Sequence, residues 1–247
     1  MYRTAIVFAI LLALGTSMSR TYGQGKSLDS LYYWFDTVIG EENSGLFAAV
    51  AYVEEYKVIN ENHRFFNSPN FNIGSIWYDG QPYIGIQMKY DLYGDEVLVN
   101  HKNNPGIPAL KMIKSKIDSF RIDNRKFVKV KSIKTNSYAT SGFHEILMDN
   151  SNFTLFKKHK KKEIKRLDRK SVYYEFKDDS EYAIVHKGTY SVIRKKKDVL
   201  TVFPQLKRAI RRLYKNNVQN TLSDDFMRSI LHNIRLIQNK SDNPESE

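Results

Sequence analysis

The stretch NIGSIWYDGQPYIGIQMKYDLYGDEVLV, residues 72–99, decides the fold, because two turns divide it into three short apolar runs. The first two runs are rich in aromatic and β-branched residues, which suit strands, and they flank Asp79-Gly80. This dipeptide tolerates the positive φ angles of a tight hairpin turn. A second break, Tyr93-Gly94-Asp95, leads into the third run. Because such short turns join antiparallel neighbours, the sequence predicts a three-stranded meander over residues 73–99.

Similar runs lie on both sides of the meander, and turn-forming residues separate them. In residues 127–131, Val128 and Val130 alternate with Lys129 and Lys131, which is the period expected for a sheet with one solvated face. With the meander, these runs predict about ten strands. The further predicted strands are 47–59, 109–113, 119–122, 127–133, 142–148, 152–158, 172–176, 182–186 and 189–193.

The pattern becomes helical towards the C-terminus, over about residues 196–239. Pro204 suits a first helical position, and the apolar residues after it fall on one helix face. Ser223 can cap a further helix, and Asp224 and Asp225 in its first turn favour a helix N-terminus. The sequence therefore predicts an α+β fold that is mainly antiparallel β. We expect a curved sheet or half-open barrel, followed by two or three C-terminal helices.

The N-terminal residues 1–23 have the layout of a secretory signal peptide. Arg3 supplies a positive start, residues 5–14 form an apolar run, and small residues follow it. The run is shorter than the roughly 20 residues of a membrane-spanning helix, which disfavours a retained anchor. We predict cleavage after Gly23, with a cut after Ser19 as the alternative, and a periplasmic or secreted product. Residues 24–240 are predicted to form a single domain, a short amphipathic helix is expected over residues 27–39, and residues 241–247 are expected to be a disordered tail.

The composition is strongly basic and lacks cysteine. The 247 residues include 39 Lys and Arg against 27 Asp and Glu, for a formal net charge of +12, and there is no Cys. The absence of Cys excludes disulfides, thiolate metal sites and a lipid on a first mature cysteine. A basic exported protein meets lipid head groups, lipopolysaccharide phosphates, acidic glycans or released DNA. Such a charge also serves solubility alone, so it does not define a site.

Two basic segments are candidate sites for an anionic ligand. The first is the run KKHKKKEIKRLDRK, residues 157–170, and the second lies on the helix after Pro204, opposite its apolar stripe. The alternative is an ordinary solvated face. Neither segment has a nucleic-acid recognition motif, which disfavours specific binding to DNA or RNA. The candidate residues are Lys157, Lys158, Lys160, Lys161, Lys162, Lys207, Arg208, Arg211 and Arg212.

Common catalytic and metal-binding signatures are missing from the sequence. There is no Gly-x-Ser-x-Gly elbow and no phosphate-binding glycine loop, and the six histidines show no metal-ligand spacing. His144-Glu145 lacks the second histidine of a metalloprotease helix, which favours a structural role. Asp91, Asp95 and Glu96 surround a glycine, but turn chemistry explains them better than calcium binding. We therefore predict no enzymatic activity, no cofactor and no metal.

Two segments carry a resemblance to a known family. They are YDGQPYIGIQMKYDLYGDEVLV, which holds Lys89-Tyr90-Asp91 and Asp95, and KKKDVLTVFPQLKRAIRRLYKNN, which holds Phe203-Pro204 at its helix start. Over residues 65–217 the chain loosely resembles an uncharacterised family of exported proteins of Bacteroidota. The resemblance implies a signal peptide, a β-rich body and C-terminal helices. It implies nothing about a ligand and transfers no catalytic residue.

The sequence thus predicts an exported binding or structural module of the cell envelope. Its partner is unknown, and an anionic or lipid-like envelope molecule, such as lipid, lipopolysaccharide or glycan, is one candidate. The first alternative is an envelope glycan hydrolase with carboxylates such as Asp91, Asp95 and Glu96 in a cleft, because the separation that defines such a pair is spatial. The second alternative is electrostatic adhesion to anionic surfaces.

Overall fold

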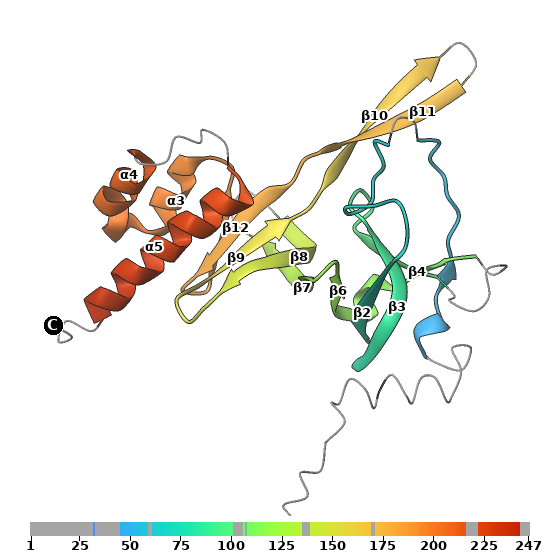
Figure 1. The fold of residues 1–247 in the computed structure, drawn as a ribbon, viewed down its shortest axis with the longest axis horizontal. Helices are drawn as coiled ribbons and strands as arrows, with labels where there is room; N and C mark the ends of the chain where they lie inside the picture. Colours follow the sequence, from blue (N-terminus) through green and yellow to red (C-terminus); the bar gives the residue numbers. More distant parts are fainter. Residues whose placement is uncertain are drawn as a thin grey trace, which may run out of the picture.

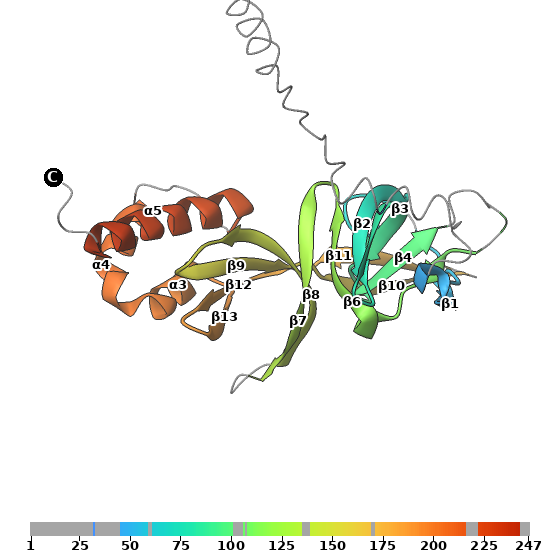
Figure 2. The same ribbon diagram turned by 90° about the horizontal axis from the view of Figure 1, so that it is seen from below.

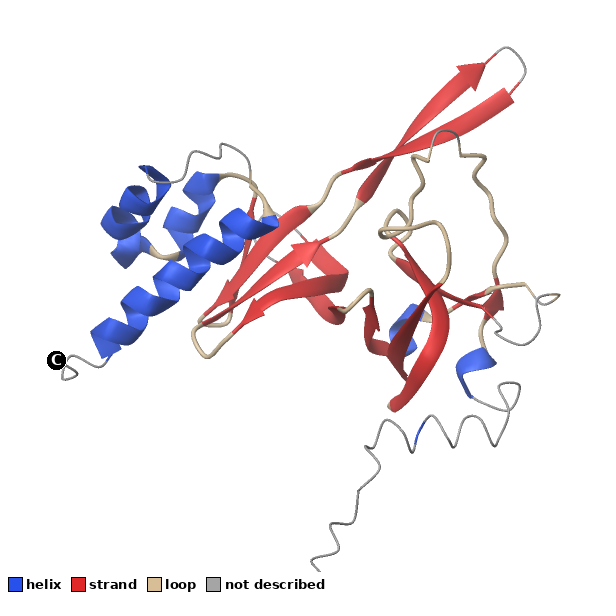
Figure 3. Ribbon diagram, in the orientation of Figure 1, coloured by secondary structure: helices blue, strands red, loops and turns tan. Residues whose placement is uncertain are grey.

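The computed structural model describes residues 32, 45–58, 61–100, 106, 108–134, 139–168, 171–215 and 222–242. The predicted signal peptide lies outside these residues, and so does the predicted helix over 27–39 apart from Tyr32. The described residues form two antiparallel sheets and three C-terminal α-helices (Figure 1; Figure 3). The predicted α+β fold with a mainly antiparallel sheet is confirmed.

The larger sheet has eleven strands in the order β1-β5-β4-β3-β2-β6-β7-β8-β9-β12-β13, and β10 and β11 pair separately. Its two edge strands, β1 and β13, do not pair with each other, so the sheet is open. The strands are β1 (Val50–Ala51), β2 (Asn72–Tyr78), β3 (Gln81–Asp91), β4 (Glu96–Asn100), β5 (Leu110–Lys111), β6 (Ile117–Ile122), β7 (Arg125–Lys134), β8 (Ala139–Asp149), β9 (Phe153–Lys158), β10 (Lys161–Asp168), β11 (Ser171–Asp178), β12 (Glu181–His186) and β13 (Thr189–Ile193).

The predicted meander is confirmed as β2, β3 and β4, which pair antiparallel. At the first turn, Asp79 has φ 53° and Gly80 has φ 78°, so both adopt the left-handed conformation that a two-residue hairpin loop requires. Of the strand predicted over 47–59, the described residues contain only β1. Residues 52–57 leave the sheet as an irregular segment.

A first apolar core forms because the sheet curls. Tyr90 of β3 contacts Phe120, Phe127 and Phe143 of β6, β7 and β8, with ring centroids 5.2, 5.3 and 6.1 Å from its own. These four rings are fully buried. Since β3 and β8 are separated by three strands in the sheet, their contact requires strong curvature. The predicted curved sheet therefore has a filled interior at this end.

A second apolar core lies between the helices and strands β8, β9, β12 and β13. Figure 1 shows the helices gathered at one end of the molecule. Figure 2 shows β7 and β8 between this helical end and the meander. Phe203, Ile210, Phe226 and Ile234 are buried here. The last helix ends three residues beyond the predicted boundary of 239. The helices are α3 (Lys196–Val202), α4 (Lys207–Lys215) and α5 (Asp224–Asp242), and 3-10 turns lie at η2 (Gly45–Phe47), η3 (Lys114–Lys116) and η4 (Pro204–Leu206).

Candidate anion-binding surface

Helix α4 presents a face that carries cations and no carboxylate. Ile210 on its other side is buried in the second core, which orients the helix. The cations recur at spacings of one and four residues, so neighbours on the helix surface have the same charge. Like charges at this spacing destabilise a helix by a few tenths of a kcal/mol per pair. The exposed cations are Lys207, Arg208, Arg211, Arg212 and Lys215.

The start of α3 adds two further cations to this face. Tyr214, in the last turn of α4, donates a hydrogen bond from its hydroxyl to the carbonyl oxygen of Lys196 at 2.8 Å. The Lys196 ammonium lies 4.7 Å from the ring centroid of Phe226 and 5.8 Å from that of Tyr214. The first turn of α3 therefore packs against the last turn of α4. Its neighbours in the chain, Lys195 and Lys197, are exposed on either side of this contact.

We call these seven exposed residues the basic helical surface: Lys195, Lys197, Lys207, Arg208, Arg211, Arg212 and Lys215. Asp198 is the one acidic residue between positions 195 and 215. Its Oδ2 accepts the backbone N–H of Arg194 at 2.9 Å and that of Lys195 at 3.0 Å, which caps α3. Within the described residues, no carboxylate forms an ion pair with these seven side chains. Their positive charge is therefore not neutralised locally.

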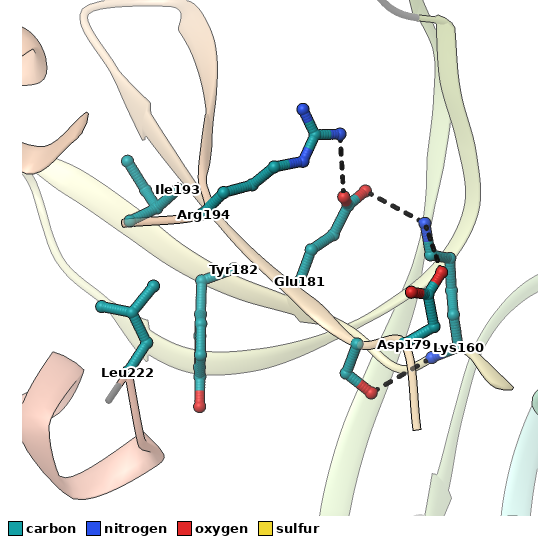
Figure 4. A pocket seen from close by; sticks show the side chains of 8 residues that line it. Lys160, Asp179, Glu181, Tyr182, Ile193, Arg194 and Leu222 are labelled. Atoms are coloured by element: carbon teal, nitrogen blue, oxygen red, sulfur yellow. Dashed lines mark hydrogen bonds and ion pairs between the residues drawn. The ribbon is translucent and has the colours of Figure 1, made fainter. Parts of the chain in front are cut away.

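A pocket of about 450 Å³ lies at the base of the helical end (Figure 4). Arg194, which directly precedes the basic helical surface, lies on its rim. The Glu181 carboxylate lies between two cations, 3.3 Å from Arg194 and 3.6 Å from Lys160. Tyr182, Ile193 and Leu222 form an apolar wall. Because its cations are already paired with acids, the pocket is not itself a concentrated anion site.

The predicted basic run at 157–162 does not join α4 in one surface. Lys157 on β9 forms an ion pair with Asp224 at the start of α5, at 2.7 Å. The next residue points to the other face of the strand, where Lys158 pairs with Asp95 at 2.6 Å. The Lys158 side chain is 7% exposed, and burial is the main cause that lowers its pKa. Both lysines therefore hold the fold together.

The remaining lysines of this run have different surroundings. Lys160 pairs with Glu181, and half-buried Lys161 at the start of β10 donates to the carbonyl oxygen of His63. Lys162 is exposed on β10. The sequence showed the charge of the run but not its passage from β9 to β10. The triple lysine 195–197 before Asp198 was the signal that could have revealed the α3 part of the surface.

A buried polar network joins the two cores and was not predicted. Glu145 on β8 accepts a hydrogen bond from His159 at 2.6 Å and one from Arg125 at 2.9 Å. Arg125 also lies 3.7 Å from Asp224, which Lys157 contacts. Burial acts to raise the pKa of Glu145, but the hydrogen bond from His159 and the charges of His159 and Arg125 lower it. Every carboxylate of this network has a partner, so we assign the network to structure.

The three acids of the hydrolase alternative are also paired. Asp91 accepts Arg64 Nε at 2.5 Å and the N–H groups of Tyr93 and Gly94, and so stabilises the β3–β4 turn. Asp95 pairs with Lys158 and Lys114, and Glu96 pairs with Lys111 at 3.3 Å. Within the described residues there is no group of three His, Asp or Glu arranged to hold a metal ion.

Asp95 also explains a glycine in β8. Gly142 has φ +97°, and a Cβ atom there would lie 1.8 Å from Asp95 Oδ2. A side chain at this position would displace Asp95 from its contacts with Lys158 and Lys114. The cluster of Asp95, Lys158 and Lys114 and the close approach of β8 to the β3–β4 turn thus both depend on Gly142.

Comparison of the chain with protein-family models, with curated proteins and with solved structures finds no match. The resemblance to exported proteins of Bacteroidota therefore stays a prediction. Within the described part of the chain, no helix combines the length and the apolar character needed to cross a membrane.

Proposed function

We propose that the protein is an exported module that binds polyanions on the basic helical surface. The observation that carries this proposal is the set of seven exposed cations at the start of α3 and on α4, none of which forms an ion pair with a carboxylate among the described residues. Phosphate- or carboxylate-bearing envelope molecules are the partners that match this charge. The shared chemistry is a dense array of anionic groups, on a lipid surface or on a glycan.

Several cations of this surface lie where the local electrostatics of the helices disfavour positive charge. Lys195 and Lys197 lie at the start of α3, where a helix dipole disfavours positive charge. On α4, Lys207, Arg211 and Lys215 repel one another along one row. The packing of Ile210 and Phe203 does not require these exposed charges. A bound polyanion would relieve the repulsion, which supports a role in binding.

The proposal places the ligand outside the sheet. The four aromatic rings of the first core fill the interior of the curve, so that end offers no described apolar lumen for a carried lipid. Asp91 and Asp95 are each paired with a cation, and the proposal assigns them no hydrolytic step.

Charge reversal at two positions tests the proposal. R208E/R212E should weaken binding to heparin and to vesicles containing phosphatidylglycerol by about tenfold or more, since each basic residue contributes about 1 kcal/mol at an anionic surface. The matched control is R121E/K126E, which changes the net charge equally at two exposed positions on β6 and β7. Equal losses in the two variants would reduce the proposal to an effect of net charge.

The two ligands separate the possible sources of the anion. Binding to heparin alone indicates a glycan, and binding to the vesicles alone indicates a lipid surface. In both cases the affinity should fall steeply between low and physiological salt, because bound counterions are released and charges are screened. Binding that is insensitive to salt would contradict the proposal.

A further inference from the structure

A second pocket, with a volume of about 450 Å³, lies at the helical end, where two strand turns meet η4 and α5. The β8–β9 turn and the β12–β13 turn are neighbours, because β9 and β12 pair as far as Phe153 and His186 beside those turns. Asn152 lines the pocket from the first turn, His186 and Lys187 from the second, Gln205 and Leu206 from η4, and Gln238 from α5. We call this site the amide pocket, because three of these side chains are carboxamides.

Packing and hydrogen bonds hold the walls of the amide pocket in place. The fully buried ring of Phe203, directly before η4, lies 4.8 Å from the His186 ring and 5.8 Å from that of Phe153. The Asn152 amide donates to Gln238 Oε1 at 3.4 Å, which connects the first turn to α5. Because Phe203 and Phe153 belong to the second apolar core, that core fixes segments far apart in the sequence around one pocket.

His186 offers a hydrogen-bond acceptor at the pocket. Its Nδ1 lies 2.8 Å from the backbone carbonyl oxygen of Asn152. A carbonyl oxygen only accepts hydrogen bonds, so Nδ1 carries the proton, and Nε2 of the neutral ring keeps its lone pair. Among the described residues, no group donates to this nitrogen. A hydroxyl group of a ligand would satisfy Nε2, whereas an oxyanion without a proton would not.

The charge of the amide pocket is not neutralised within it. Of the described residues that line the pocket, none is acidic. Exposed Lys187 forms no ion pair in the described part of the chain, and the described residues provide no hydrogen bond to the carboxamide of Gln205. The pocket of Figure 4 differs, because Glu181 there pairs with Arg194 and Lys160. The amide pocket thus combines one unpaired cation with neutral groups that both donate and accept.

This set of groups matches a ligand that is rich in hydroxyl groups. Carboxamides and hydroxyls both donate and accept, so they can pair in either direction. A lipid chain would leave the amides and the imidazole nitrogen without partners, which costs free energy, and inorganic phosphate would face acceptors as well as donors. The volume lies within the range of about 300–1,000 Å³ that is usual for small-molecule sites. Leu206 adds an apolar wall for the C–H groups of a sugar ring.

We propose that the amide pocket binds a hexuronic acid unit of a glycan. The carboxamides of Asn152, Gln205 and Gln238 bind the sugar hydroxyls, and His186 Nε2 accepts from one of them. Lys187 binds the carboxylate. A neutral sugar would use the same amides but would leave the lysine ammonium without an anion. Because hydrogen bonds between charged groups are stronger than those between neutral ones, Lys187 sets the preference for an acidic sugar.

The inference deepens the proposed function, and for a longer glycan chain it rests on that function. Gln205 and Leu206 at the pocket directly precede Lys207 and Arg208 of the basic helical surface. A chain of uronic acid units with one unit in the pocket would therefore continue onto that surface, where its other carboxylates meet cations. Of the two sources of anionic groups, this assigns the glycan. A single sugar in the pocket does not require the helical surface, so the two sites can be tested separately.

Methyl glycosides of glucuronic and galacturonic acid, with the neutral methyl glucoside and galactoside as counterparts, test the pocket in the full chain. In saturation-transfer difference NMR titrations, at least one uronate should bind about threefold or more tightly than its neutral counterpart. Q205L/Q238L should weaken the binding of both classes of sugar about tenfold, because hydroxyl groups lose their partners. K187Q should abolish the preference for the uronate. The matched control K126Q, at an exposed position on β7, should retain it.

The inference is overturned if neither uronate binds, if Q205L/Q238L binds the sugars as tightly as the wild type, or if K187Q and K126Q behave alike. If the double variant has a lowered thermal unfolding midpoint, Q205L alone carries the test, because Gln205 is exposed.

The charge-reversal variant separates this inference from the proposed function. R208E/R212E should leave binding of the neutral galactoside unchanged, because that ligand carries no charge. Sugar binding in the pocket together with unchanged heparin and vesicle binding in R208E/R212E would contradict the proposed function alone. Loss of heparin binding in R208E/R212E, without any binding of the uronates to the wild type, would contradict the pocket inference alone.

Discussion

At the scale of single residues, His144 shows how burial determines a protonation state. Its side chain is buried, with Nδ1 3.2 Å from the carbonyl oxygen of Gly142 and Nε2 3.0 Å from the Tyr190 hydroxyl. A carbonyl oxygen only accepts hydrogen bonds, so Nδ1 carries the proton and Nε2 accepts from Tyr190. Burial, and then the charge of Lys158, lowers the pKa of His144 to about 4.

This low pKa predicts acid sensitivity. An unfolded histidine titrates near pH 6.5, so below that pH the unfolded state binds a proton that the folded state does not. The contribution of the neutral His144 to the free energy of unfolding is fully present above pH 6.5 and is lost as the pH falls towards 4. Between pH 7 and pH 5 the wild type should lose about 2 kcal/mol more than H144Q, measured by urea unfolding. Parallel losses in both proteins would contradict the assignment.

Residue-scale features differ in how far the sequence predicts them. The Asp79-Gly80 turn was predictable, because positive φ angles depend on the two residues themselves. The contact between Glu145 and His159 was not, since it depends on the pairing of β8 with β9 and on the curl of the sheet. The Asp91 turn falls between these cases: its local hydrogen bonds follow from residue type, but its ion pair with Arg64 does not.

At the scale of elements, the basic run 157–170 gives the clearest difference between sequence and structure. Strand β10 lies in this run and was not predicted, since lysine and glutamate are uncommon in strands. The pairing of β10 with the aromatic strand β11 overrides that preference. Because side chains alternate along a strand, Lys157 and Lys158 lie on opposite faces of β9, and each forms an ion pair with an aspartate. A linear cluster of charge therefore becomes two internal ion pairs and one exposed hairpin.

The irregular segment 52–58 is positioned by one buried arginine. Arg64 contacts Glu54 and Asp91, both at 2.5 Å, and its guanidinium lies 4.6 Å from the Tyr56 ring centroid. At its far end the segment reaches β11, where the Tyr174 N–H donates to the carbonyl oxygen of Lys57 at 2.9 Å. The segment thus connects the edge of the large sheet to the base of the projecting hairpin.

Loss of this arginine should free the segment. R64M should lower the free energy of unfolding by about 3 kcal/mol, because it leaves the buried Asp91 without its cation. Trypsin should also cleave more rapidly after Lys57, which mass spectrometry of the fragments would detect. K111M is the matched control, since it breaks the exposed Lys111–Glu96 pair and should cost less than about 1 kcal/mol. Equal destabilisation by the two substitutions would show that Arg64 does not anchor the segment.

At the scale of the whole molecule, strand β8 connects the two apolar cores. Phe143 near its start belongs to the first core, and Leu147 belongs to the second. Glu145 lies between them and accepts hydrogen bonds from His159 and Arg125. The sequence predicted a single domain over residues 24–240, and this strand provides a physical reason to expect the two cores to unfold together.

This coupling predicts a single unfolding transition. In a W34F background, which leaves Trp77 as the one tryptophan, the fluorescence of Trp77 on β2 and the far-ultraviolet circular dichroism signal of the helices report mainly on opposite ends. If the two cores unfold together, their urea curves should coincide. E145A should lower the stability by about 3 kcal/mol and shift both curves together, because the buried His159 and the partly exposed Arg125 lose their common acceptor. Two separated midpoints in the wild type would show instead that the cores are independent cooperative units. Separation in E145A alone would identify the polar network, rather than the continuous strand, as the element that couples them.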